Sequence, residues 1–177
     1  GFRRFDPFLT ATGEASFALP ARLNAAGWRS IFVHPHDMRF YNRAGIMTAG
    51  GFAELVGEER FAPPGAGEGR YVTDAAMTDA ILRMAQSADC PTLIYAVTIE
   101  NHGPWQTGNS GDDAGAEYLR LLKNGDAMLG RLAEGLRTLN RPAMLVFFGD
   151  HRPSIPGVCE PGGARHTPFV VLRFDAR

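Results

Sequence analysis

The sequence predicts an α/β domain with a mostly parallel sheet and flanking helices. Two observations lead to this prediction. Short apolar runs typical of buried strands alternate along the 177 residues with segments whose apolar positions recur at helical spacing. Strands and helices that alternate in this way are joined most simply by crossover connections, which give a parallel sheet with helices on its faces. The length suits a single domain with a substantial core.

The first half of the chain contains one clear strand and several shorter elements. A helix is expected at residues 20–26, since a proline is tolerated in its first turn and the following glycine supplies a stop. The run at 29–33 is typical of a strand, and it ends in a polar cluster at 34–43. A short helix is expected at 52–56. The stretch 63–69, rich in glycine and proline, is expected to form a surface loop.

The second half of the chain shows stronger periodicity. Thr73 is expected to cap a helix whose apolar positions, from Ala76 to Met84, recur every three or four residues and serve packing. A long helix with one apolar stripe is expected at 113–139. Three strands are expected in this half, at 92–99, 143–148 and 168–174. Strands and helices therefore alternate along most of the chain, as in a mostly parallel α/β sheet.

Composition and charge exclude several classes of protein. The 18 basic and 19 acidic residues nearly cancel, to a formal net charge of -1, so no nucleic-acid surface is expected. No apolar stretch approaches the roughly 18 to 20 residues of a membrane helix, so no membrane segment is expected in this chain. Cys90 and Cys159 lie far apart and form no CxxC, which argues against a disulfide framework or a thiolate metal site.

Asp150 and His151 follow the strand expected at 143–148 and the chain-breaking Gly149. Open α/β sheets place their chemistry at the C-terminal tips of strands. A carboxylate and an imidazole are both ligands for a divalent cation, and this pair admits manganese, zinc, magnesium or calcium. For the dipeptide alone, an exposed loop without function is the alternative. The sequence predicts half of a metal site at this strand tip.

Histidines also follow the other predicted strands. His34 and His36 come after the first strand, and His102 comes after the second. Because the C-terminal tips of parallel strands share one edge of the sheet, we expect these side chains to meet Arg43, Asp150 and the neighbouring histidine there. Each residue taken alone could belong to a plain surface loop. The prediction of a site depends on their convergence.

This set of residue types fits a site that handles a tetrahedral oxyanion such as phosphate or sulfate. The planar guanidinium of Arg43 can grip the anion, and His102 can donate to it or protonate a leaving alkoxide. Two protein ligands are fewer than a catalytic metal generally needs. Glu100 is a further candidate ligand, and Thr10 or Thr12 is a weak candidate for the nucleophile.

Several motifs in the same order resemble the sulfatase-like enzymes of the alkaline phosphatase superfamily. The nearest branch is that of the lipoteichoic-acid-synthase-like phosphoglycerol transferases and the bacterial capsular polysaccharide biosynthesis proteins. The similarity covers most of the chain. Its motifs are VTIENHGP at 97–104, FFGDHRP at 147–153, HP at 34–35 and FYNR at 40–43, with further similarity at 1–7, 27–30 and 51–52.

The resemblance implies a role for each residue of the set. Asp150 and His151 would hold the divalent ion, for which manganese is the first choice. His102 would contact the phosphoryl group of the substrate. The remaining side chains would line the substrate pocket: Arg43, Tyr41, His34 and His36. His36 falls where the synthases have an acidic residue.

The resemblance also implies what the whole protein does. It would be a metal-dependent phosphoryl-ester transferase or hydrolase in bacterial cell-envelope or capsular polysaccharide biosynthesis, with a phosphorylated glycolipid or polysaccharide as substrate. It would act at the extracytoplasmic face of the inner membrane, as part of a membrane-anchored parent protein, with a cytoplasmic location as the alternative. A sulfate ester hydrolase and an inactive polysaccharide-binding member are the alternatives.

Family members have a threonine or serine nucleophile and a glutamate ligand on the N-terminal side of the region matched here. Residues 1–177 would then be the C-terminal portion of a single sulfatase-like catalytic domain, with an alkaline-phosphatase-like fold that is incomplete at its N-terminus. We therefore expect the full-length protein to be an enzyme and this portion alone to be inactive.

Overall fold

The computed structural model describes residues 17–105, 114–160, 162–163 and 166–176. Two candidates for the nucleophile, Thr10 and Thr12, lie outside the described residues. The chain divides into two compact units, Gly1–Glu100 and Asn101–Arg177, here called unit 1 and unit 2.

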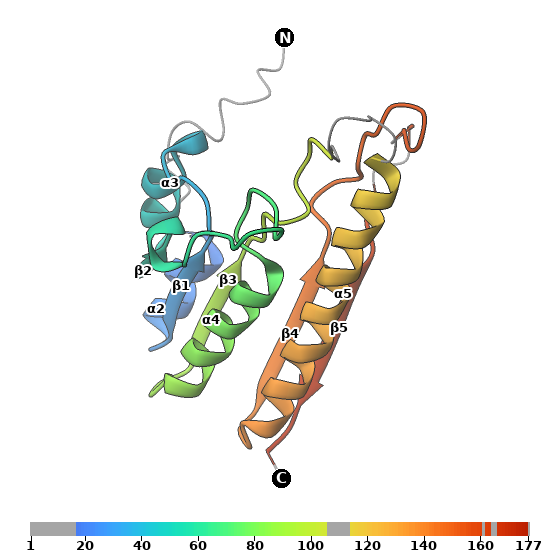
Figure 1. Ribbon diagram of the computed structural model, residues 1–177. Coiled ribbons are helices and arrows are strands. Elements are labelled where there is room, and N and C mark those ends of the chain that lie inside the picture. Colours follow the sequence, from blue (N-terminus) through green and yellow to red (C-terminus); the bar gives the residue numbers. More distant parts are fainter. Residues whose placement is uncertain (1–16, 106–113, 161, 164–165, 177) are drawn as a thin grey trace. The chain divides into compact units, whose positions relative to one another are not determined.

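Unit 1 is built on a three-stranded parallel sheet (Figure 1). Within it, Ile31 pairs with Glu54 on one side and with Ile94 on the other. The strands are β1 (Arg29–Val33), β2 (Glu54–Val56) and β3 (Thr92–Ala96), in the order β2-β1-β3. The helices are α2 (Leu19–Ala25), α3 (Arg43–Ala49) and α4 (Asp74–Ser87), with single 3-10 turns η2 (Phe40–Asn42) and η3 (Glu58–Arg60).

The core of unit 1 lies around β1, the central strand. Phe32 and Val33 have no exposed surface, as expected for a strand that has a neighbour on each side. Residues of β1, β2 and α4 form one buried apolar cluster: Ile31, Val33, Val56 and Met77. Helix α4 begins as predicted, since Thr73 Oγ1 accepts a hydrogen bond from the Ala76 N–H at 3.2 Å.

Unit 2 contains the long helix α5 (Ala114–Thr138) and the strands β4 (Ala143–Phe148) and β5 (Phe169–Phe174). The two strands pair in antiparallel fashion, with Leu145 opposite Leu172, and α5 contacts both of them (Figure 1). Burial alternates along β4, because successive side chains of a strand point to opposite faces. The buried stripe of α5 consists of Leu121, Met128, Leu132 and Leu136.

The structure confirms the strands predicted at 29–33 and 143–148, and the helix at 113–139 differs by one residue at each end. The prediction of a helix at 52–56 is wrong. Ala53 N–H donates to Ser30 O at 2.9 Å, and the residues that follow pair with β1 as β2. Five residues are too few for apolar periodicity to separate a helix from a strand.

The structure also differs from the sequence prediction in the extent of one strand, in helix α3 and in the direction of the last strand. The strand expected at 92–99 ends at Ala96. Helix α3 begins inside the segment 34–43, which the sequence indicated only as a polar cluster. The last strand, β5, is antiparallel to β4, so the parallel arrangement holds for the sheet of unit 1. In the part of the chain that the structure describes, no helix has both the length and the apolar character to cross a membrane.

Candidate functional site

His34 is the first residue after β1 and is buried, with 1% of its surface exposed. Its backbone N–H donates to Val56 O at 2.9 Å and so continues the sheet. Its ring nitrogen Nδ1 lies 2.9 Å from the carbonyl oxygen of Val97. A carbonyl oxygen only accepts hydrogen bonds, so we assign the proton of the neutral ring to Nδ1. His34 is therefore fixed at the end of the sheet.

The His36 ring lies among three other rings. Its centroid is 5.9 Å from that of His34, 6.2 Å from that of Phe40 and 5.8 Å from that of Tyr71. We call His34, His36, Phe40, Tyr41 and Tyr71 the aromatic cluster. Sequence reasoning identified neither Phe40 nor Tyr71 as a site residue on chemical grounds. The cluster brings Tyr71, distant in sequence, to the loop after β1.

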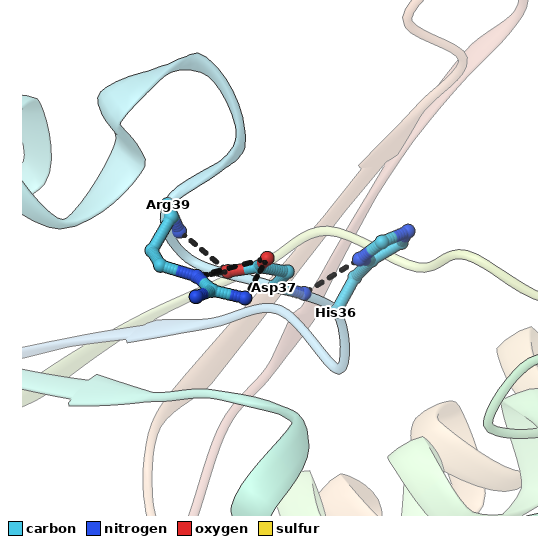
Figure 2. Close-up of polar contacts among 3 residues, drawn as sticks. All are labelled: His36, Asp37 and Arg39. Atoms are coloured by element: carbon cyan, nitrogen blue, oxygen red, sulfur yellow. Dashed lines mark hydrogen bonds and ion pairs between the residues drawn. The ribbon is translucent and has the colours of Figure 1, made fainter.

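An ion pair fixes the loop beside His36 (Figure 2). Arg39 Nε lies 2.9 Å from Asp37 Oδ1, and Arg39 Nη2 lies 2.8 Å from Asp37 Oδ2. These hydrogen bonds lower the pKa of Asp37 to about 2, so its carboxylate stays charged. The pair is exposed and adds little stability. The ion pair matters for the geometry of the loop, because it holds the residue whose backbone N–H donates to His36 Nδ1 at 2.5 Å.

Arg43 opens helix α3 next to the aromatic cluster. Its guanidinium carbon lies 5.8 Å from the Phe40 ring centroid and 5.6 Å from the Tyr41 ring centroid, which is cation–π geometry. Burial lowers the pKa of Arg43, although a guanidinium remains protonated at neutral pH. No carboxylate among the described residues forms an ion pair with it. In the described part of the chain, no carboxylate competes with an anionic ligand for this cation.

Tyr41 and Asn42 are strained at the backbone. Both have left-handed conformations, with φ of 55° and 49°, which cost about 1 to 2 kcal/mol for each non-glycine residue. A Cβ at Gly45 would lie 2.7 Å from Asn42 Oδ1, so glycine leaves space for that side chain. Strain of this kind concentrates at functional sites. Here it sets the turn that presents Tyr41 and Arg43.

A buried pair of acidic residues joins the N-terminus of α4 to the end of the segment after β3. Asp74 and Glu100 have 3% and 5% of their surface exposed. The Asp74 backbone N–H donates to Glu100 Oε2 at 2.7 Å, as expected for a carboxylate at a helix N-terminus. Burial, with a smaller contribution from the charge of Glu100, raises the pKa of Asp74 to about 7. From the sequence, Glu100 is a candidate metal ligand. In the structure its Oε2 accepts the hydrogen bond from the Asp74 N–H.

In unit 2, Gly149, Asp150 and His151 form the turn after β4. Gly149 N–H donates to Pro168 O at 3.2 Å, and Thr167 Oγ1 donates to Gly149 O at 2.6 Å. A Cβ at Gly149 would lie 3.2 Å from Thr167 Cβ, so glycine allows this close approach. Sequence reasoning missed Thr167, which precedes the partner strand and fixes the turn.

The chemistry of Asp150 and His151 fits a divalent cation. Both are exposed at the strand tip, with 77% and 71% of the side chain accessible. His151 Nδ1 lies 3.1 Å from Arg152 O, so we assign the ring proton to Nδ1 and the lone pair to Nε2. That is the arrangement of most metal-binding histidines. His151 Nε2 lies 3.6 Å from Asp150 Oδ2, so the two donors lie side by side.

These two donors are an incomplete ligand set. Within the described residues, no group of three or more histidine, cysteine, aspartate or glutamate side chains could hold a metal. Catalytic metals generally have at least three protein ligands.

His102 lies in an exposed turn at the start of unit 2. Its Nδ1 lies 2.8 Å from the carbonyl oxygen of Gly103, which again assigns the ring proton to Nδ1. Trp105 Nε1 donates to Asn101 Oδ1 at 2.8 Å across the same turn. The Trp105 ring packs edge to face against Tyr118 of α5, with centroids 5.4 Å apart. The turn that holds His102 is therefore attached to α5.

The predicted site residues fall into two groups. Unit 1 brings together the residues expected to bind substrate: His34, His36, Tyr41 and Arg43. Unit 2 contains the residues expected to bind metal and the phosphoryl group: Asp150, His151 and His102.

Solved structures show the fold to which the chain is similar. The lipoteichoic acid synthase LtaP from Listeria monocytogenes matches with a TM-score of 0.70 and 16% identity, over 89% of this chain and 45% of that one. The phosphoglycerol transferase GacH from Streptococcus pyogenes, in complex with sn-glycerol-1-phosphate, matches with a TM-score of 0.64 and 19% identity. That match covers 83% of this chain and 44% of the other.

A curated relative is more similar in sequence. The capsular polysaccharide biosynthesis protein RkpI of Rhizobium meliloti (strain 1021) is 32% identical over 170 residues, which are 94% of this chain and 32% of RkpI. The chain thus spans about a third of that relative's length. The Sulfatase family model matches residues 7–175, nearly the whole chain. The α/β fold is also similar to that of a protein of the alkaline phosphatase superfamily from Vibrio parahaemolyticus, with a TM-score of 0.69 and 17% identity over 96% of this chain and 45% of that one. The chain therefore belongs to the sulfatase family.

Proposed function

We propose that the protein of which this chain is a part is a metal-dependent phosphoryl-ester transferase or hydrolase of the phosphoglycerol transferase type. Family membership and the fold support an enzyme of the sulfatase and alkaline phosphatase class. Similarity to a capsular polysaccharide biosynthesis protein supports a phosphorylated glycolipid or polysaccharide as substrate. We further propose that it acts in the bacterial cell envelope, at the extracytoplasmic face of the inner membrane.

The observation on which the proposal rests is the arrangement of Asp150 and His151. A carboxylate oxygen and an imidazole lone pair lie 3.6 Å apart at a strand tip, and the other ring nitrogen is bonded to a backbone carbonyl. We propose manganese as the ion, with zinc, magnesium or calcium as the other outcomes, because a carboxylate and an imidazole together admit each of them. A divalent cation here would neutralise the nonbridging oxygens of the transferred group.

The side chains of unit 1 would bind the substrate. Arg43 has a planar guanidinium without a carboxylate partner among the described residues, and it would grip the phosphoryl ester through two parallel N–H groups. Tyr41 would contact the glycerol-like part, and the His34 and His36 rings would form the neighbouring wall. His102 would contact the phosphoryl group, with Nε2 as its outward-facing nitrogen, since Nδ1 is bonded to Gly103 O.

We further propose that residues 1–177 are the C-terminal portion of one catalytic domain, inactive when separated from the rest. The chain spans less than half of the solved structures that it matches and about a third of RkpI. The nucleophile and a further metal ligand would come from the N-terminal side of the matched region.

A sulfate ester hydrolase is the second candidate, and the Sulfatase family model favours it. Phosphate and sulfate esters share tetrahedral geometry, but a phosphomonoester has the larger negative charge. The two candidates therefore predict different preferences for matched p-nitrophenyl phosphate and p-nitrophenyl sulfate substrates.

The test uses the full-length protein and follows ester turnover against added manganese. Asp150→Asn and His151→Gln should each lower the turnover at least a hundredfold, because even partners of metal ligands affect activity by about 10 to 100-fold. Asp175→Asn, which removes an exposed carboxylate paired with Arg173, is the control and should leave turnover unchanged. Full activity of Asp150→Asn would contradict the metal assignment. Turnover of the sulfate ester alone would favour the second candidate.

A further inference from the structure

We propose that His36 determines substrate specificity by presenting its Nε2–H as a fixed hydrogen-bond donor. The inference rests on the proposed function, since it concerns the group of the substrate next to the phosphoryl ester bound at Arg43. A fixed donor binds a charged acceptor oxygen more strongly than a neutral one, because a charge-assisted hydrogen bond is about twice as strong. The substrate class it indicates is a phosphoryl ester with a neighbouring carboxylate or carbonyl, in preference to one with a hydroxyl at that position.

The backbone decides which nitrogen of His36 holds the proton. Asp37 N–H lies 2.5 Å from His36 Nδ1, and a backbone N–H can only donate. Nδ1 must therefore be the acceptor, which leaves the proton of the neutral ring on Nε2. The other ring nitrogen points away from Asp37 and Arg39 (Figure 2), and nothing in the described part of the chain accepts a hydrogen bond from it.

The neighbours of His36 keep this arrangement in place. The Asp37 carboxylate is held by Arg39 in bonds of 2.8 to 3.1 Å, which fix the backbone that delivers the Asp37 N–H. The rings of His34, Phe40 and Tyr71 surround the imidazole and limit its rotation. A donor that is fixed before binding discriminates well, because little ordering is required when the ligand arrives.

Phe40 links His36 to Arg43. The His36 ring centroid lies 6.2 Å from the Phe40 centroid, and the guanidinium carbon of Arg43 lies 5.8 Å from that same centroid. The separation of the two groups cannot exceed the sum of these distances, about 12 Å. A small ligand can therefore span from a phosphoryl group on Arg43 to an acceptor oxygen on His36, with its carbon chain over Phe40.

Two small probes differ in the group that would accept the hydrogen bond from His36. Glycerol 1-phosphate ends in a CH2OH group opposite its phosphate, whereas 3-phosphoglycerate has a carboxylate in place of that group. The affinity of both is measured by calorimetry on the full-length protein, and the ratio of the two dissociation constants is compared between variants. In the first probe the hydroxyl oxygen accepts a neutral hydrogen bond in place of the charge-assisted one, so we expect the wild type to prefer 3-phosphoglycerate by roughly tenfold.

Three substitutions separate donation from charge. His36→Gln retains an N–H donor and should retain the preference, whereas His36→Leu has no donor and should lose it. These two variants have the same charge, so a difference between their ratios reports the hydrogen-bond donor alone. His36→Glu can only accept and should reverse the preference. Equal ratios in His36→Gln and His36→Leu would overturn the inference.

Arg43→Ala separates this inference from the proposed function. It should weaken both probes without changing their ratio, because the phosphoryl group is common to both. If Arg43→Ala weakens both probes but the His36 variants leave the ratio unchanged, the inference alone fails. If the wild type binds neither probe, the proposed phosphoryl pocket fails and the inference fails with it.

Discussion

Asp74 provides a sharp test of the energetics of unit 1. Its side chain is buried beside Glu100, and its Oδ1 has no hydrogen-bond partner among the described residues. Its pKa is raised from 3.8 to about 7, mainly by burial and to a smaller extent by the charge of Glu100. Replacing Asp74 with asparagine keeps the shape of the protonated carboxyl and removes its titration. The substitution should therefore change how stability depends on pH.

The sign and the magnitude follow from the raised pKa. A carboxyl whose pKa is raised by folding favours the folded state in its protonated form, and this advantage is lost as the pH rises through about 7. A shift of about 3 units corresponds to about 4 kcal/mol at 1.36 kcal/mol per unit, which is an upper limit because local relaxation reduces it. Asp74→Asn should thus stabilise the protein at pH 8 by up to this amount. At pH 4 it should have almost no effect.

The assay is urea unfolding of wild type and Asp74→Asn at half-unit steps from pH 4 to pH 9. The difference in unfolding free energy should grow between pH 4 and pH 8 and then stay constant. Asp79→Asn, at an exposed position of the same helix, is the control for the aspartate-to-asparagine substitution itself. A constant difference between Asp74→Asn and wild type across the whole range would refute the reasoning, since it would mean that Asp74 ionises normally in the folded protein.

Two further predictions concern glycine 51 and the turn after β4. Gly51→Ala should destabilise the protein strongly, because φ is 97° and the added Cβ would lie 2.6 Å from Ala21 N. Gly27→Ala, where φ is 82° and no atom lies near the added Cβ, should cost only the backbone strain of about 1 to 2 kcal/mol. If thermal unfolding shows the same loss of stability for Gly27→Ala and Gly51→Ala, the clash between the Cβ at residue 51 and Ala21 is excluded. Thr167→Val removes the hydrogen bond to Gly149 O, so it should lower both the turnover and the manganese affinity of the full-length protein. Thr138→Val, at an exposed position of α5, should lower neither.

Much of the fold could be predicted because strands and long helices have strong local signals. The runs at β1 and β4 are apolar and end at polar residues or glycine, so their bounds were predicted to the residue. Helix α3 could not be predicted in the same way. It starts after Tyr41 and Asn42, which both have a left-handed backbone. Tyrosine rarely adopts this conformation, so the sequence does not predict it. The antiparallel pairing of β5 with β4 is likewise set by tertiary contacts and not by local sequence.

The candidate site was predictable as residue types and not as contacts. Asp150 and His151 could be selected because a turn after a buried strand exposes them. Tyr71 could not be selected, since nothing in its neighbourhood in sequence indicates that its ring lies 5.8 Å from that of His36. Thr167 was missed for a similar reason, although its place just before the partner strand of β4 was a usable signal.

Proton placement is the property of the site that depends most on the fold. In His34, His102 and His151 the Nδ1 atom faces a backbone carbonyl, so each neutral ring has its lone pair on Nε2. In His36 the Nδ1 atom faces a backbone N–H, so the lone pair and the proton change places. Four histidines that are equivalent in the sequence are thus divided by their backbone partners into three acceptors and one donor. In His151 the lone pair on Nε2 leaves that atom able to bind a cation, whereas in His36 the proton on Nε2 leaves that atom able to donate to an acceptor.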